Sequence, residues 1–415
     1  MLNVERPLYR LMGVTIAAFF IFGLMRDGFA ASLTGFWAIQ LHPARLINDY
    51  TLVGGTGGAL VNAGILGIIS LVLVKINAVR LAGPTIAGIF TIMGFALFGK
   101  TPFNTFPIMF GVFLAGFLVK KPFKNYILIA LFGTALGPVV SFLVAEAGFM
   151  GAQGYILGIL AGIITGMALA AVSMAMLRMH EGFNLYNIGL TAGFFGLFVA
   201  GVLRALGKDV SITVIWNTEA IPHLMILIPF ICVLFIFWGI ITSPGGFWGE
   251  LKKLTKLSGR LPSDFIESTG SAGTLVNVGL LGLLASGYMF FVGASFNGPT
   301  LGGLMTLMGF GAFGKHLRNC IPIFLGVIVA TLLFGKSLTA PGPILAFLFA
   351  TTLAPLAGEF GPLIGMAAGF VHLIMVEQSA AWHGGLDLYN NGFAGGLTAT
   401  LFVAVIQWVR ANRED

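Results

Sequence analysis

The sequence contains one long unit twice, and this duplication limits the folds that the chain can adopt. Residues 83–100 read GPTIAGIFTIMGFALFGK, and residues 298–315 read GPTLGGLMTLMGFGAFGK. Further along, HEGFNLYN at 180–187 is matched by HGGLDLYN at 383–390. An internal repeat has to be recognised before any local pattern is interpreted, because it sets the architecture. We therefore divide the chain into a first repeat, residues 1–210, and a second repeat, residues 211–415.

Composition places the duplicated unit in a membrane. The chain is 57% hydrophobic and 9% charged, with a mean hydropathy of +0.98, whereas soluble domains are about 25% charged. Long apolar runs recur about seven times in each repeat, and about 20 apolar residues suffice to cross a bilayer. Open strands would leave backbone groups unsatisfied in lipid. We therefore predict an all-α polytopic membrane protein with about 14 hydrophobic segments.

The basic residues predict an orientation. If the N-terminus is inside and every segment crosses, most of the 22 Lys and Arg fall in inside loops, as the positive-inside rule requires. Corresponding loops differ between the repeats: Lys75 and Arg80 have no basic counterpart near 290–295, and the basic loop 252–260 corresponds to a loop with Arg45 alone. We therefore predict inverted-topology repeats and a multi-pass protein of the cell inner membrane with cytoplasmic N- and C-termini.

Each Gly-Pro-Thr segment predicts a broken or re-entrant helix. A proline at the first helical position marks a helix start, and the start carries the positive end of the helix dipole. Interrupted segments at matching positions of two inverted repeats indicate a substrate site in transporters. Thr85 and Thr300 would contribute hydroxyl groups to it. The alternative is an ordinary helix start at the lipid interface, and the segments either span or re-enter.

The most polar duplicated motif lies at the second match. Its imidazole, amide, carboxyl and phenol groups supply hydrogen-bond donors and acceptors for a small polar solute. The candidate substrate-binding residues of the motif are His180, Asn184, Tyr186, Asn187, His383, Asp387, Tyr389 and Asn390. On a helix, His383 and Asp387 would be neighbours and would support proton coupling. The alternative is an interfacial turn in which tyrosine is an aromatic anchor.

Four further polar residues recur inside apolar surroundings. Asn62 and Asn277 lie in apolar helices and either line a cavity or make hydrogen bonds between helices. Lys100 and Lys315 follow the Gly-Pro-Thr segments. They would attract an anion if those segments re-enter, but we favour loop lysines that snorkel to the membrane surface.

Signatures of soluble enzymes are missing from the sequence. It contains no P-loop, HExxH or CxxC, and its histidines lack metal-ligand spacing. The net charge of +7 arises from short loops between the segments, so it does not indicate nucleic-acid binding. We therefore predict a protein that is not an enzyme and has no cofactor or metal. Its expected partners are a small-molecule solute and the lipid bilayer, and a homo-oligomer is left open.

The duplicated signatures resemble those of a bacterial integral-membrane family of unknown function, over almost the whole chain. The plan is also similar to that of urea transporters, in which two inverted halves with re-entrant segments surround a central pore. Leu185-Tyr186-Asn187, followed by Gly189, resembles the aromatic-Asn-Gly start of their pore helices. The resemblance to urea transporters implies a pore or a transporter, and the resemblance to the family of unknown function brings no substrate with it.

We therefore expect a membrane transporter that moves a small polar solute through a site between the two halves. Ion or proton coupling is supported by the difference between Asn184 and Asp387. The first alternative is a passive channel for a small neutral solute of the urea or ammonia type, which the strong symmetry favours. The second alternative is a membrane-embedded enzyme or a scaffold without transport.

Overall fold

The fold is built from helices. The computed structural model describes residues 2–243 and 245–412, and within these ranges it contains helices, turns and one isolated bridge between Asn48 and Ile215. The first half comprises α1 (Leu2–Gln40), α2 (Tyr50–Val53), α3 (Gly55–Ile76), α4 (Gly83–Phe95), α5 (Pro102–Leu118), η1 (Phe123–Tyr126), α6 (Ile127–Gly133), η2 (Thr134–Leu136), α7 (Gly137–Ala145), α8 (Ala152–Met179) and α9 (Asn187–Ala205). The second half comprises α10 (Pro222–Thr242), α11 (Phe247–Leu254), α12 (Phe265–Thr269), α13 (Ser271–Val292), α14 (Gly298–Phe310), α15 (Leu317–Leu333), α16 (Pro341–Phe349), η3 (Ala350–Leu353), α17 (Ala354–Phe360), α18 (Pro362–Trp382) and α19 (Asn390–Ala411).

Each half contributes five helical segments that are long and apolar enough to cross a membrane, counted over residues 2–243 and 245–412. They are α1, α3, the broken helix 123–145, α8 and α9, and then α10, α13, the broken helix 341–360, α18 and α19. Together with the shorter α4, α5, α14 and α15 they match the predicted number of segments. The prediction of an all-α polytopic membrane protein is confirmed.

The Gly-Pro-Thr segments are too short to span. Helices α4 and α14 have 13 residues each, which is about 20 Å of helix against a hydrocarbon core of about 30 Å. Every residue of α14 is buried. The two helices are therefore half-helices enclosed by protein, which is where an interrupted backbone is tolerated at membrane depth.

A second interruption was not expected from the sequence. The apolar segment near 125–144 is broken by the 3₁₀ turn η2 at Thr134, and its counterpart is broken by η3, which contains Thr351. A proline follows each turn at the start of the next helix, Pro138 in α7 and Pro355 in α17. Proline is favoured in the first turn of a helix and not in its interior, so it separates two short helices here.

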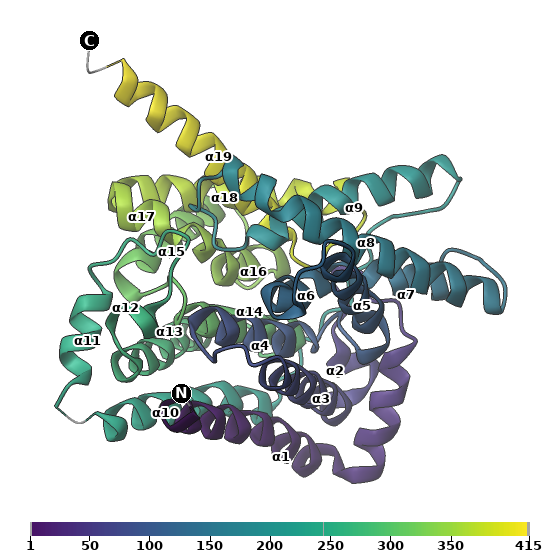
Figure 1. Cartoon of the computed structure of the whole chain (residues 1–415), viewed down its shortest axis with the longest axis horizontal. Coiled ribbons are helices and arrows are strands. Elements are labelled where there is room, and N and C mark those ends of the chain that lie inside the picture. The colour runs from purple at the N-terminus through teal and green to yellow at the C-terminus, as the bar shows by residue number, and fades with distance from the viewer. Residues whose placement is uncertain (1, 244, 413–415) are drawn as a thin grey trace.

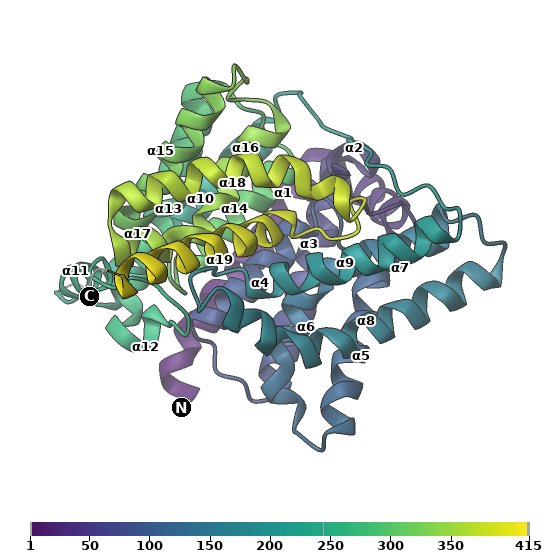
Figure 2. The same ribbon diagram turned by 90° about the horizontal axis from the view of Figure 1, so that it is seen from above.

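Helices from the two halves pack on their own counterparts. Helix α4 packs on α14, α9 on α19, and α1 on α10. Figure 1 shows α4 and α14 at the centre of the molecule, with α1 and α10 below them and α9 and α19 above. Viewed from above, α18 and α19 lie across the upper surface beside α9 (Figure 2). Contacts between equivalent elements are the pattern of a two-fold relation.

Individual hydrogen bonds between the halves follow the same two-fold relation. The backbone N–H of Gly83 donates to Asp264 Oδ1, and that of Gly298 donates to Asp49 Oδ1, each at 3.2 Å. Thus each half supplies a carboxylate to the N-terminus of the other half's half-helix, where the dipole favours negative charge. The halves are joined across their centre, and their inverted orientation in the membrane remains a prediction.

That orientation is tested at the C-terminal ends of α3 and α13. We expect a membrane-impermeant maleimide to label Val292→Cys in intact cells, but Ala78→Cys only after permeabilisation, because inversion puts corresponding loops on opposite faces. Both variants are made without Cys232 and Cys320, which are buried. Labelling of both positions from the same side would contradict inverted repeats.

Candidate functional site

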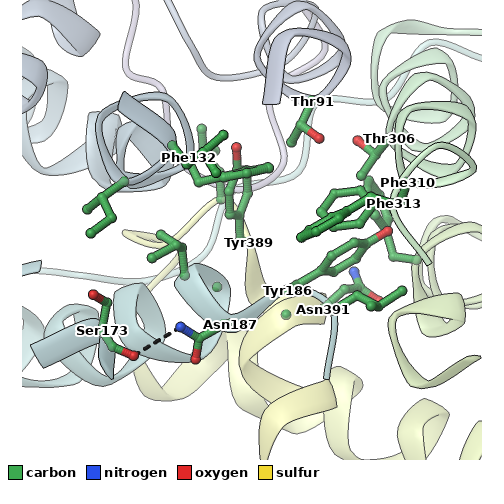
Figure 3. A pocket seen from close by; sticks show the side chains of 18 of the residues that line it. Thr91, Phe132, Ser173, Tyr186, Asn187, Thr306, Phe310, Phe313, Tyr389 and Asn391 are labelled. Atoms are coloured by element: carbon green, nitrogen blue, oxygen red, sulfur yellow. Dashed lines mark hydrogen bonds between the residues drawn. The ribbon is translucent and has the colours of Figure 1, made fainter. Parts of the chain in front are cut away.

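A cavity of about 190 Å³ lies between the halves. Its lining includes pairs of equivalent residues from the two repeats: Thr91 with Thr306, Phe95 with Phe310, Phe132 with Phe349, Leu185 with Leu388, Tyr186 with Tyr389, and Gly189 with Gly392. In Figure 3 the hydroxyl groups of Thr91 and Thr306 are directed toward each other, and the rings of Tyr186, Tyr389 and Phe310 gather around the same space. The cavity therefore lies where the two-fold relation brings the halves together.

The wall of the cavity is mainly aromatic and aliphatic, with few polar groups. Asn187 and Asn391 line it, and Asn187 is held by a hydrogen bond from its Nδ2 to the carbonyl of Ser173 at 3.0 Å (Figure 3). The hydroxyls of Thr91 and Ser173 are buried in the lining without a protein partner among the described residues. Ligand sites commonly combine an apolar lining with a few such polar groups.

The first turns of α9 and α19 form one side of the cavity. A Cβ atom on Gly189 would lie 2.8 Å from Gly392 Cα, and one on Gly392 would lie 2.9 Å from Gly189 Cα. Only glycine allows the two helix starts to approach so closely. The positive ends of two helix dipoles consequently meet at this wall.

The histidines of the duplicated motif support the turns that precede these helices. His180 Nε2 lies 3.0 Å from Asn187 Oδ1, and its Nδ1 accepts the backbone N–H of Asn184 at 3.2 Å. His383 makes the same contacts, with Asn390 Oδ1 at 3.0 Å and the N–H of Asp387 at 3.4 Å. Because a backbone N–H only donates, Nδ1 has to be the acceptor and each ring is neutral with its proton on Nε2. Neither ring is part of the cavity lining.

The predicted pairing of the His383 ring with the Asp387 carboxylate is wrong. His383 is the C-cap of α18, and Gly384 and Gly385 follow with φ of +59° and +73°. The chain therefore leaves the helix, and the spacing of four residues does not place the two side chains together. Asp387 Oδ1 accepts the backbone N–H of Tyr389 at 2.8 Å instead.

The side chains of Asp387 and its counterpart Asn184 differ in their hydrogen-bond partners. Asn184 Nδ2 donates to the carbonyl of Gly392 at 3.1 Å, and Asn184 Oδ1 accepts from the hydroxyl of Thr352. Ala135 occupies the position of Thr352 in the first half. Asp387 is fully buried, and its Oδ2 has no partner among the residues that the structure describes.

The other predicted binding groups are engaged with the backbone. The Thr85 and Thr300 hydroxyls donate to the carbonyls of Arg80 and Ser295 in capping turns at the starts of α4 and α14. The amides of Asn62 and Asn277 each donate to two carbonyls where those half-helices end. The acceptors are Ala96 O and Lys100 O for Asn62, and Gly311 O and Lys315 O for Asn277, at 2.7–2.8 Å. These four residues hold the interrupted segments and do not line the cavity.

Lys100 and Lys315 are fully buried, each with 0% of its surface exposed, so the snorkelling interpretation is wrong. Lys100 Nζ donates to Thr134 Oγ1 at 2.7 Å and to the hydroxyl of Tyr389. In the second half, Lys315 Nζ donates to Thr351 Oγ1 at 2.7 Å and to the hydroxyl of Tyr186. Each lysine thus binds a threonine of its own half and a tyrosine of the other half.

Of the predicted solute-binding residues, the structure places Tyr186, Asn187 and Tyr389 in the cavity wall. The sequence interpretation missed the threonine pairs at positions 91 and 306 and at positions 134 and 351. A signal was present for the second pair, because Thr-x-Leu-x-Pro occurs at 134–138 and again at 351–355. Among the described residues no group of three His, Cys, Asp or Glu side chains is suited to a metal ion.

A family model described as "Protein of unknown function (DUF1576)" matches residues 29–205 and 243–408. The chain belongs to the DUF1576 family. The two matched regions each cover most of one half, as expected for a duplicated DUF1576 protein. The chain matches no curated protein and no solved structure, and its resemblance to urea transporters therefore remains an expectation.

Proposed function

We propose that this DUF1576 protein is a membrane transporter that moves a small solute through the cavity between its two halves. The observation that carries the proposal is the cavity itself, lined by equivalent residues of both repeats where interrupted segments meet. A site between inverted halves allows alternating access when one half moves against the other. The sequence predicts a small polar solute. The mainly apolar wall favours, within that class, a solute with an apolar body and few polar groups.

A passive channel is the second candidate. It is favoured by the cavity lining, which contains pairs of identical residues and no charged side chain. A pore without charged groups conducts neutral solutes with little barrier and needs no coupling ion. A proton dye separates the candidates, since a channel for a neutral solute produces flux without a pH change.

We further propose a membrane location, an orientation and partners for the protein. The inner membrane with cytoplasmic termini is supported by the distribution of Lys and Arg over the loops. We propose no catalytic step and no cofactor, and the partners would be the solute and the bilayer. A homo-oligomer remains open.

The cavity is tested by filling it. Thr91→Phe on α4 should abolish solute flux in proteoliposomes, because Thr91 is 2% exposed and lines the cavity. Flux is screened with urea, ammonium, glycerol, L-leucine, L-lactate and phenylacetate, with a pH dye in parallel. Val72→Phe, at a residue of α3 that is 48% exposed, is the control of equal bulk.

The expected result is flux of at least one solute for the wild type and for Val72→Phe, and the background of empty liposomes for Thr91→Phe. All three proteins have to elute as folded particles in detergent. Equal solute flux through Thr91→Phe and the wild type would show that the solute does not pass through this cavity. A folded wild type without flux of any solute would contradict transport of these classes.

A further inference from the structure

The two buried lysines bring positive charge to the centre of the molecule. Lys100 Nζ lies 4.4 Å from the ring centroid of Tyr389 and 5.4 Å from that of Phe95. Lys315 Nζ lies 4.4 Å from the ring centroid of Tyr186 and 5.2 Å from that of Phe310. These four rings line the cavity. Both Nζ atoms therefore lie close to rings that line the cavity, and the face of an aromatic ring favours a cation.

The hydrogen bonds around Lys100 engage the hydroxyl proton of Thr134 but not that of Tyr389. An ammonium group only donates, so the hydroxyls of Thr134 and Tyr389 have to accept from Lys100. Thr134 uses its own proton in a bond to the carbonyl of Leu131 at 2.6 Å. The proton of the Tyr389 hydroxyl finds no acceptor among the residues that the structure describes.

The second half repeats this arrangement. Thr351 accepts from Lys315 and donates to the carbonyl of Leu348 at 3.1 Å. The Tyr186 hydroxyl accepts from Lys315 and also lies against the hydroxyl of Thr351. A hydroxyl that accepts from an ammonium is polarised and becomes a stronger donor. The Tyr389 hydroxyl is such a donor, and none of the described residues accepts its proton.

The acidic groups do not balance the two lysines. Asp387 forms no ion pair with Lys100 among the described residues, and its Oδ2 is unpartnered. Lys315 likewise forms no ion pair with a carboxylate in the described part of the chain. The neutral rings of His180 and His383 add no charge. Neither lysine is thus paired with a carboxylate.

We propose that the cavity binds a small organic monoanion, a monocarboxylate with an apolar body, which supplies the missing negative charge. This proposal rests on the proposed transport function and names its substrate class. The carboxylate accepts hydrogen bonds from the hydroxyls of Tyr186 and Tyr389 and from the unpartnered hydroxyl of Thr91. The helix starts at Asn187 and Asn390 add the positive ends of their dipoles. The apolar body contacts the phenylalanine rings of the wall.

The test compares two ligands of nearly equal shape and different charge. Phenylacetate and its neutral amide, phenylacetamide, are titrated against the detergent-purified full chain at pH 7 by equilibrium dialysis. We expect phenylacetate to bind at least tenfold more tightly than the amide. Lys315→Met, which removes the charge and keeps a long side chain, should abolish this preference. Lys336→Met is the control, since Lys336 is an exposed lysine paired with Glu377.

If Lys315→Met does not fold, Tyr186→Phe serves in its place, because it removes one hydroxyl and keeps the ring. Absence of phenylacetate binding, equal binding of acid and amide, or an unchanged preference in the folded variant would overturn the anion assignment. Flux of neutral solutes without any preference for anions would overturn it and leave transport standing. Charge-selective binding without flux would support the anion site and contradict transport.

Discussion

Replacing Asn277 by leucine is expected to destabilise the protein by about 2–6 kcal/mol, because two buried carbonyl groups would each lose their donor at about 1–3 kcal/mol. The side chain is 1% exposed, and its Nδ2 donates to the carbonyls of Gly311 and Lys315 at 2.8 Å each. These carbonyls lie where α14 ends, so no helical N–H is available to replace the amide. The expected measurement is a large fall in the melting temperature of the purified protein in detergent.

Two further variants sharpen this prediction. Asn277→Asp keeps the shape but replaces donors by acceptors, so it should destabilise at least as strongly as leucine. Asn77→Leu, on a partly exposed turn where the amide bonds to Leu73 O, should have a small effect. A melting temperature of Asn277→Leu that equals the wild type would show that these carbonyls find water or other donors. The stability of the turn between Gly311 and Lys315 would then not depend on the amide of Asn277.

Replacing Asp387 by asparagine is expected to abolish accumulation driven by a proton gradient while exchange of solute across the membrane continues. Asp387 is a fully buried carboxylate beside the cavity with an unpartnered oxygen. A bound anion makes its protonation more favourable, and by linkage protonation makes anion binding more favourable. Asparagine cannot change its charge, so solute and proton would no longer move together.

The fold should tolerate this change. The new amide is expected to donate to the carbonyl of Gly189, as Asn184 donates to the equivalent carbonyl of Gly392 at 3.1 Å. The measurement is uptake into proteoliposomes with and without an inward proton gradient, using the panel solute of fastest flux. Asn184→Asp is the matched variant from the other half. If Asp387→Asn still accumulates solute against its gradient, the Asp387 carboxyl is not the coupling group. If the wild type moves solute without moving protons, the channel is favoured.

Differences between the two halves support a role of Asp387 in proton coupling. The second half also carries the pair His372 and Asn391, with His372 Nε2 3.0 Å from Asn391 Oδ1, where the first half has Leu169 and Ile188. Two ionisable groups of the second half, Asp387 and His372, thus have no ionisable counterpart in the first half. A symmetric pore would not need such a difference, whereas coupling requires a group that changes its charge during the cycle.

Several predicted residues prove to be important for a different reason. Asn62 and Thr85 recur in the second repeat and are buried as expected, but both satisfy backbone groups at the interruptions of the helices. A polar residue in an apolar segment indicates that a partner exists in the protein interior. It does not distinguish a backbone carbonyl from a solute, because both offer the same oxygen acceptor.

The duplication, the helical membrane fold and the matching polar positions follow from the sequence alone, because apolar length and repeated residues do not depend on how the chain is packed. The tertiary structure decided which polar groups meet. The partner of Lys100 is Tyr389, 289 positions away in the other half, and the sequence around either residue contains no information about that distance. Snorkelling was the simpler expectation for a lysine after a short apolar helix. The packing of α4 against α14 instead encloses both lysines, because half-helices of about 20 Å end inside the protein and cannot carry their last residues to the membrane surface.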